Sequence, residues 1–243
     1  RIVEVLRDRG IDEPTGAQRE AIPRILEGRN VLVVAHTGIG KTEAAMLPIL
    51  HRLLEEPGKG IKCIYITPLR ALNRDMLKRL TEFGEALELG VAVRHGDTSQ
   101  SERQAQSRNP PHVLITTPET LQVLFTGKRL REHISRVKWV VIDEIHELAG
   151  NERGAQLAIA LERLTELAGE FQRIGLSATV GSVEEVAGFL AGTGREVDIV
   201  RTHVSKELDL RVEAPQVLDE DRDLAGRLLS DPQLVAGMRR CRS

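Results

Sequence analysis

The fold of this chain is decided by one stretch, Val31-Leu32-Val33-Val34-Ala35-His36-Thr37-Gly38-Ile39-Gly40-Lys41-Thr42. Its first four residues are continuously apolar, as expected of a strand that is covered on both faces. The residues from 41 to 55 that follow have the apolar spacing of a helix. A glycine-rich loop between a strand and a helix, ending in Lys-Thr, is typical of a phosphate-binding Walker A loop.

The chemistry of such a loop assigns a role to each part of it. Backbone amides and the positive end of the following helix surround the phosphates, Lys41 reaches the terminal ones, and Thr42 would hold magnesium. Ala35 stands where the general pattern has glycine, but the flexible glycines remain. The alternative is a glycine turn with a surface lysine, which the flanking strand and helix disfavour. We expect nucleotide contacts from Thr37, Gly38, Ile39, Gly40, Lys41 and Thr42.

Short runs rich in β-branched residues recur along the chain, with helical patterns between them. This alternation predicts an α/β domain with a mostly parallel central sheet and helices on both faces. We expect strands at residues 31–35, 62–67, 91–95, 113–117, 138–143 and 172–177. We expect helices near residues 16–27, 41–55, 70–87, 101–107, 118–125, 153–168 and 182–191. Pro48 should bend the second of these helices.

Composition restricts the class of protein more than it identifies a partner. The chain has 243 residues and a formal net charge of -2, which fits one large domain and neither favours nor excludes nucleic acid. No apolar run is long enough to cross a bilayer, so we expect no membrane partner. Two cysteines, Cys63 and Cys241, suit a reducing compartment better than a disulfide framework. We therefore expect a cytoplasmic location, with Cys63 as a buried small side chain.

Two carboxylates follow directly after the apolar run Trp139-Val140-Val141-Ile142. Ligands of open α/β sheets bind at the carboxyl ends of the strands, where Asp143 and Glu144 would lie. Asp143 is suited to ordering magnesium through its water shell, and Glu144 to polarising the water that attacks the γ-phosphate. Alone, such a pair could be a solvated strand end. With the phosphate loop it completes an ATPase site.

Together these motifs resemble the superfamily 2 DExH-box helicases. Asp143-Glu144-Ile145-His146 matches the DExH box, and Ser177-Ala178-Thr179 matches motif III. The strings around residues 143–156 and 175–190 are most similar to the large helicase-related (Lhr) branch. The remaining matches are Pro14 to Pro23 with the Q motif, Thr67 to Leu72 with motif Ia, Arg94 to Thr98 with a nucleic-acid-contacting loop, and Thr117 to Thr120 with motif Ib.

The resemblance implies a RecA-like P-loop domain that binds ATP and Mg²⁺, with roles for further residues. Gln18 would contact the base, although it could instead cap a helix. His146, Ser177 and Thr179 would couple the ATP state to nucleic-acid grip, although the last two could merely complete a strand-end turn. Arg70 would contact nucleic acid or be a solvated charge. The implied backbone contacts are Pro68, Arg70, His95, Gly96, Asp97, Thr117, Pro118 and Glu119.

In this family ATP is closed between two RecA-like domains, the second of which brings arginines. We find one such pattern, over residues 1–203, followed by residues 204–243 as a linker and helix leading toward a second domain. The expected function is ATP-driven movement on, or unwinding of, single-stranded DNA or RNA, with slow hydrolysis by this chain alone. The alternatives are an RNA-remodelling DExH helicase that opens short duplexes, and a module that uses ATP as a conformational ligand without turnover.

Overall fold

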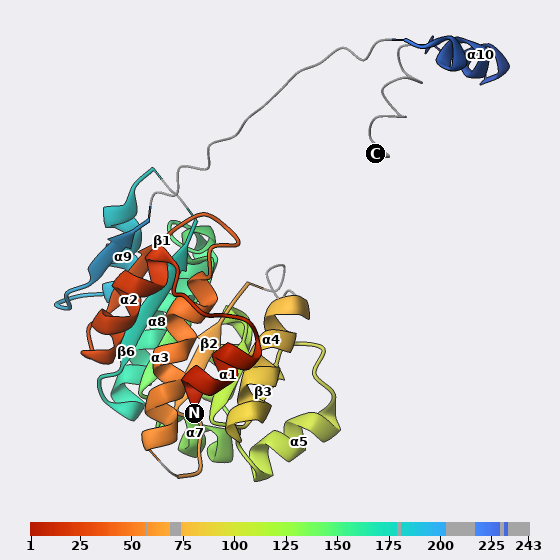
Figure 1. Cartoon of the computed structure of the whole chain (residues 1–243). Helices are drawn as coiled ribbons and strands as arrows, with labels where there is room; N and C mark the ends of the chain where they lie inside the picture. The colour runs from red at the N-terminus through yellow and green to blue at the C-terminus, as the bar shows by residue number, and fades with distance from the viewer. Residues whose placement is uncertain (57, 69–73, 179–180, 203–216, 229–230, 233–243) are drawn as a thin grey trace. The chain divides into compact units, whose positions relative to one another are not determined.

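The computed structural model describes residues 1–56, 58–68, 74–178, 181–202, 217–228 and 231–232 (Figure 1). The chain divides into two compact units, Arg1–His203 and Val204–Ser243. In the second unit the described helix is α10, Asp219–Leu228, whose first turn carries Asp219, Glu220 and Asp221, where the helix dipole favours negative charge. Among the described residues, none of the helices has the length and apolar character that a membrane span requires.

The first unit is built on a sheet of seven strands in the order β3-β4-β2-β5-β6-β1-β7. Every strand pairing is parallel, which confirms the predicted sheet and extends it. The strands are β1 Val31–Val34, β2 Cys63–Ile66, β3 Val91–Arg94, β4 Val113–Thr116, β5 Trp139–Ile142, β6 Gln172–Ser177 and β7 Asp198–Arg201.

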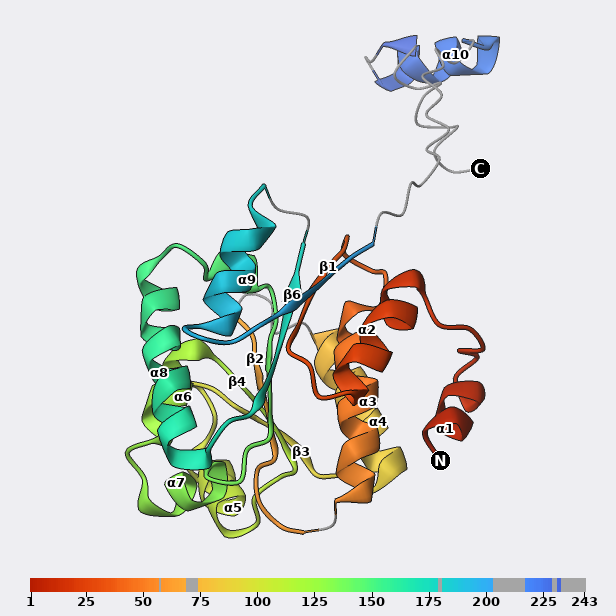
Figure 2. The same cartoon turned by 90° about the vertical axis from the view of Figure 1, so that its left-hand side faces the viewer.

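Helices cover both faces of this sheet (Figure 2). One layer consists of α1 Ile2–Asp8, α2 Gly16–Leu26, α3 Lys41–Glu55 and α4 Arg74–Leu87. The other consists of α6 Pro118–Leu124, α7 Lys128–Ile134, α8 Glu152–Ala168 and α9 Val183–Ala191. The remaining helix of this unit is α5, Gln100–Arg108. The helix α3 continues through Pro48, which is buried, to Glu55.

Alternation along the strands divides the core between the two layers. Successive side chains of a strand point to opposite faces of the sheet. Cys63 and Tyr65 of β2 therefore pack in the apolar cluster beneath α2, α3 and α4, whereas Ile64 and Ile66 pack beneath α6 to α9. Burial also raises the pKa of the Cys63 thiol, as expected for a small core side chain. Cys241 lies outside the described residues.

Four elements of the first unit were not predicted: α1, α7, β7 and the 3₁₀ helix Ile145–Glu147. Each is short, at seven, seven, four and three residues, so each offers at most two periods of a helix or strand pattern. The strand β7 is an edge strand, and its sequence Asp-Ile-Val-Arg becomes a strand by pairing with β1, Val31 lying opposite Asp198. Tertiary pairing, rather than local pattern, makes it a strand.

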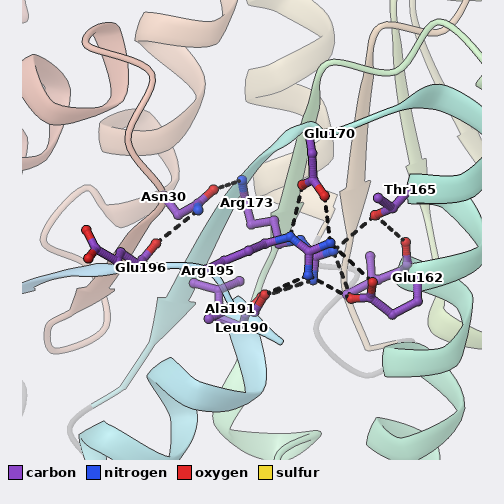
Figure 3. A network of polar contacts seen from close by, with 10 residues as sticks. Asn30, Glu162, Thr165, Glu170, Arg173, Leu190, Ala191, Arg195 and Glu196 are labelled. Carbon is purple, nitrogen blue, oxygen red and sulfur yellow. Dashed lines mark hydrogen bonds and ion pairs between the residues drawn. The ribbon is translucent and has the colours of Figure 1, made fainter. Parts of the chain in front are cut away.

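A buried arginine joins the start of β6 to two helices (Figure 3). The side chain of Arg173 is only 1% exposed, and burial lowers its pKa. Its guanidinium donates to Glu162 Oε1 at 3.0 Å, Thr165 Oγ1 at 3.2 Å, Ala191 O at 3.3 Å and Leu190 O at 3.4 Å. Arg195 donates to Glu162 and to Glu170 beside it. This polar cluster holds α8 and the end of α9 against the sheet.

Replacing Arg173 by alanine should lower the free energy of unfolding by about 3 kcal/mol, because buried carbonyls lose their donor and a cavity forms. Urea denaturation at neutral pH would measure it. Arg201→Ala is the matched control: Arg201 pairs with Glu184 where both side chains are largely exposed, at 46% and 72%, so the loss should stay within about 1 kcal/mol. Equal losses would show that the Arg173 cluster contributes no more than a surface ion pair.

Candidate functional site

The phosphate loop begins where β1 ends, and β1 is the neighbour of β6, which in turn neighbours β5. Ala35 N donates to Ser177 O at 3.1 Å, so the start of the loop is bonded to the end of β6. Gly38 and Gly40 adopt left-handed backbone angles, with φ of 84° and 79°. The positive φ favours glycine at position 40, and a Cβ atom there would also lie 2.4 Å from Gln18 Nε2 and displace that amide.

The predicted phosphate-binding lysine lies inside this loop. Lys41 is the first residue of α3 and is only 7% exposed. Its Nζ donates to Ala35 O at 2.7 Å, which holds the ammonium within the curve of the loop. Burial lowers the pKa of Lys41, and the carboxylates of Glu144 and Asp143 partly oppose that shift. The surface-lysine alternative is therefore wrong.

The predicted carboxylates stand at the end of β5, close enough to Lys41 to act on its pKa. Asp143 is 8% exposed, and both of its oxygens are engaged: Oδ2 accepts from Tyr65 Oη at 2.7 Å, and Oδ1 accepts from Glu144 N at 3.0 Å. Burial raises the pKa of Asp143, and the Tyr65 hydrogen bond partly offsets the shift. Oxygen ligands of this kind suit a hard divalent cation.

Glu144 has an unusual backbone. Its φ of 46° lies in the left-handed region, which a residue with a side chain occupies at a cost of about 1 kcal/mol or more. It precedes the short 3₁₀ helix Ile145–Glu147, so the chain turns sharply straight after β5. The chain therefore leaves the direction of β5 between Asp143 and Glu144.

His146 connects the acidic pair to the end of β6. Its Nδ1 lies 3.4 Å from Ala178 N and 3.5 Å from Glu144 Oε2. A backbone N–H can only donate, so the first contact needs an unprotonated Nδ1, whereas an ion pair with Glu144 needs a protonated one. The two contacts therefore exclude one another. Ser177 Oγ is buried and donates to Ala178 O at 2.8 Å, as in a strand-end turn. Thr179 lies outside the described residues.

Gln18 caps a helix, which was the alternative to base contact, and it makes one further contact. It forms a capping box with Thr15 at the start of α2, its Oε1 accepting from Thr15 N at 3.1 Å. Its Nε2 donates to Gly40 O at 3.3 Å. The side chain thus caps a helix and also contacts the phosphate loop. Its contact with a base stays a prediction.

A hollow of about 710 Å³ brings together the three segments that were expected to contact nucleic acid. Its lining comes from the ends of β2 and β4, from the loop after β3 and from the start of α8. The lining residues are Pro68, Gly96, Asp97, Thr117, Glu119, Thr120, Glu147 and Arg153. Pro118 follows Thr117 as the first residue of α6, and His95 adjoins Gly96. Arg70 lies outside the described residues.

The loop after β3 is held by a residue that the sequence did not single out. Arg103, on α5, donates to Gly96 O at 2.6 Å, Thr98 O at 2.8 Å and His95 O at 3.1 Å. A capping box from Ser99 to Glu102 starts this helix. That motif was a usable sequence signal for the helix and its boundary, but it does not identify the arginine. Three carbonyl contacts fix the course of the loop.

Two of the residues that line the hollow form an ion pair. Arg153 Nε lies 2.6 Å from Glu119 Oε1, joining the first turns of α6 and α8. Burial raises the pKa of Glu119, but the Arg153 contacts outweigh this and hold it below its ordinary value. The two residues are 34 positions apart, and no local pattern connects them.

Comparison with known proteins then places the chain. The model of the DEAD/DEAH box helicase family matches residues 15–186. The chain belongs to this family. Residues 15–186 contain the Walker A loop, the acidic pair and all three segments that line the hollow. The resemblance to helicases stated from the motifs is thereby confirmed, as is the RecA-like fold, and the chain is similar to Lhr helicases of superfamily 2.

Among the relatives of this helicase domain are Lhr proteins of archaea and bacteria. The "ATP-dependent helicase Lhr-Core" of Methanothermobacter thermautotrophicus is 44% identical over 245 residues, covering 92% of this chain and 28% of the relative. The "Lhr helicase/ probable uracil glycosylase" of Mycolicibacterium smegmatis is 44% identical over 218 residues, covering 83% of this chain and 14% of the relative. The chain spans less than a third of the length of either protein.

Solved helicases share the fold of the chain. The structure of Mycobacterium smegmatis helicase Lhr bound to ssDNA and AMP-PNP superimposes with a TM-score of 0.73 at 39% identity, covering 94% of this chain and 32% of that one. The DUF1998 helicase MrfA bound to DNA and AMPPNP gives a TM-score of 0.71 at 28% identity, covering 82% of this chain and 28% of that one.

Proposed function

We propose that this domain binds magnesium ATP and that the protein couples ATP hydrolysis to movement along, or unwinding of, nucleic acid. The observation that carries the proposal is the strand order β5-β6-β1, which brings the acidic pair after β5 to the same edge of the sheet as the phosphate loop after β1. Lys41 would bind the terminal phosphates, Thr42 and Asp143 the metal, and Glu144 the attacking water.

Magnesium fits the oxygens that this site offers. The described residues contain no cluster of three or more His, Cys, Asp or Glu side chains able to hold a metal. Magnesium does not need one, since it usually keeps several waters and is bound by one or two protein oxygens together with substrate phosphates. When bound, it would neutralise the charge that develops on the phosphates. Thr42 and Asp143 would supply the protein oxygens.

For nucleic acid, we infer contact with the sugar-phosphate backbone and not with the bases. The described lining of the hollow carries three carboxylates, Asp97, Glu119 and Glu147, against one cation, Arg153, so hydroxyls and backbone N–H groups would have to donate to the phosphates. The described lining contains glycine, proline, threonine and charged residues, and no aromatic ring on which a base could stack. Backbone contacts carry little sequence information, so we expect weak base preference. The neighbour bound to ssDNA and AMP-PNP supports single-stranded DNA as the ligand, with RNA as the alternative. Arg70 would add to the same surface.

Coupling would run through the end of β6. His146 Nδ1 lies within 3.5 Å of both Glu144 Oε2 and Ala178 N and can bond only one of them at a time, so it lies between the acidic pair and motif III. We propose that His146, Ser177 and Thr179 couple the nucleotide state of the ATP site to the strength of nucleic-acid binding. Residues 1–203 would act with a second RecA-like domain, toward which residues 204–243 lead. We also propose that the protein is located in the cytoplasm.

The proposal is tested by ATPase rates with and without single-stranded DNA or RNA, at low and moderate salt. The comparison uses this chain and a chain extended to the length of the Lhr-Core relatives. Stimulation of the extended chain that weakens with salt supports a nucleic-acid motor and reveals the preferred strand. Nucleotide binding without stimulation by either nucleic acid would favour the ATP-gated module instead.

The loop beside the hollow provides a sharper test of nucleic-acid contact. Arg103→Ala should weaken single-stranded DNA binding about 5- to 10-fold relative to Arg108→Ala, because three carbonyl hydrogen bonds that order the loop are lost. Both residues lie on α5, and Arg108 is exposed, so the two variants lose the same charge from one helix. Fluorescence anisotropy at fixed salt measures both. Equal affinities would mean that loop order does not matter for binding.

A further inference from the structure

The hydroxyl of Tyr65 lies between the two residues to which we assign the metal. Tyr65 is fully buried, on β2. Its Oη donates to Asp143 Oδ2 at 2.7 Å, and the Thr42 side chain lies close enough to act on the pKa of the same hydroxyl. The phenol is thus bonded to the end of β5 and lies beside the first turn of α3.

Strand geometry explains why this particular residue reaches the site. In the parallel pairing of β2 with β5, Tyr65 lies opposite Val141. Side chains alternate along each strand, so Tyr65, Val141 and Asp143 share one face of the sheet. The helix α3, which carries Thr42, packs on that same face. A tyrosine one position earlier or later on β2 would point into the opposite core.

The donor and acceptor capacities of the three side chains determine which of them donates a hydrogen bond and which accepts it. An ionised aspartate, the form that ligates a metal, can only accept hydrogen bonds. The single hydroxyl proton of Tyr65 is therefore donated to Asp143. One oxygen of Asp143 is thereby held in place. A hydrogen bond between the phenol oxygen and Thr42 would then need Thr42 as its donor, which would leave the lone pairs of the Thr42 oxygen for a cation.

We propose that Tyr65 is a positioning residue that orients Thr42 and Asp143 together for magnesium. The inference rests on the proposed function, in which those two residues hold the metal. A tyrosine that served only to fill the core could bond any buried acceptor, whereas this hydroxyl bonds Asp143 and lies beside Thr42, the two residues assigned to the metal. Residues that orient metal ligands in this way typically change metal affinity by about 10- to 100-fold when they are altered.

The test measures AMP-PNP binding to the chain across a series of free Mg²⁺ concentrations and in EDTA. Tyr65→Phe keeps the ring and removes the hydroxyl. We expect the Mg²⁺ concentration for half-maximal stabilisation of nucleotide binding to rise about 10-fold, while affinity in EDTA stays within about twofold. The control is Thr116→Val on the neighbouring strand β4, which removes a buried hydroxyl that donates to Arg94 O at 2.8 Å.

The outcomes separate this inference from the proposed function. A Mg²⁺ requirement in Tyr65→Phe no greater than in Thr116→Val, or an equal loss in EDTA, would overturn the positioning role and leave the metal assignment standing. If the unaltered chain bound AMP-PNP equally with and without Mg²⁺, the metal assignment itself would be wrong, and the inference with it.

A second measurement needs no substitution. Tyr65 is the only tyrosine of the chain, so fluorotyrosine labelling gives one ¹⁹F resonance. We expect that resonance to shift when Mg²⁺ is added to the AMP-PNP complex, because the hydrogen-bond partners of the hydroxyl change their charge environment. A resonance that does not respond to Mg²⁺ would contradict the inference even if Tyr65→Phe fails to fold.

Discussion

A chain extended to the length of the Lhr-Core relatives should hydrolyse ATP about 10³ to 10⁵ times faster than residues 1–243 alone, in the presence of single-stranded nucleic acid. The physical reason is the charge that spreads over the transferring phosphoryl group. We expect a second RecA-like domain to bring arginines to that charge, as the resemblance implies. We expect the phosphate loop and acidic pair to bind ATP without those arginines but not to replace their effect on the transition state.

Rates should be measured at saturating ATP, with AMP-PNP affinity determined for both chains. The affinity comparison is the control, because it separates a defect in binding from a defect in chemistry. An isolated chain whose rate lies within about tenfold of the extended one would contradict the expectation, since a missing arginine finger costs far more. It would mean that residues 1–243 already complete the catalytic site.

Replacing Glu144 by glutamine in the extended chain should lower the ATPase rate by about 10² to 10⁴, the usual contribution of a positioned general base. Glutamine keeps the size of the side chain and the Glu144 N–H that donates to Asp143, so AMP-PNP affinity should change little. Single-turnover hydrolysis measures the chemical step directly.

The matched control for Glu144→Gln is Glu152→Gln, the same chemical change at an exposed residue in the first turn of α8. Its rate should stay close to that of the unaltered chain. If both variants hydrolysed ATP at the same rate, Glu144 would not be the group that activates water. Its left-handed backbone would then need another explanation.

The sequence by itself determined the local elements that carry the chemistry. The phosphate loop is a strand, a glycine turn and a helix in direct succession, so local pattern sufficed to predict it, whereas the burial of Lys41 came from the structure. The same holds for Asp143 and Glu144, which directly follow a continuously apolar strand. The parallel sheet followed from the alternation of such units, and only short elements of the first unit were missed: α1, α7, β7 and the 3₁₀ helix after β5.

Only the tertiary structure decided which distant residues meet at these elements. Tyr65 and Asp143 are 78 positions apart and Glu119 and Arg153 are 34 apart. Each pair meets because strand order and helix packing bring two chain segments together. The Gln18 amide likewise reaches the phosphate loop only through the packing of α2 against α3. Periodicity along the chain specifies which face of an element is buried, but the partner on that face is set by the three-dimensional order of the strands.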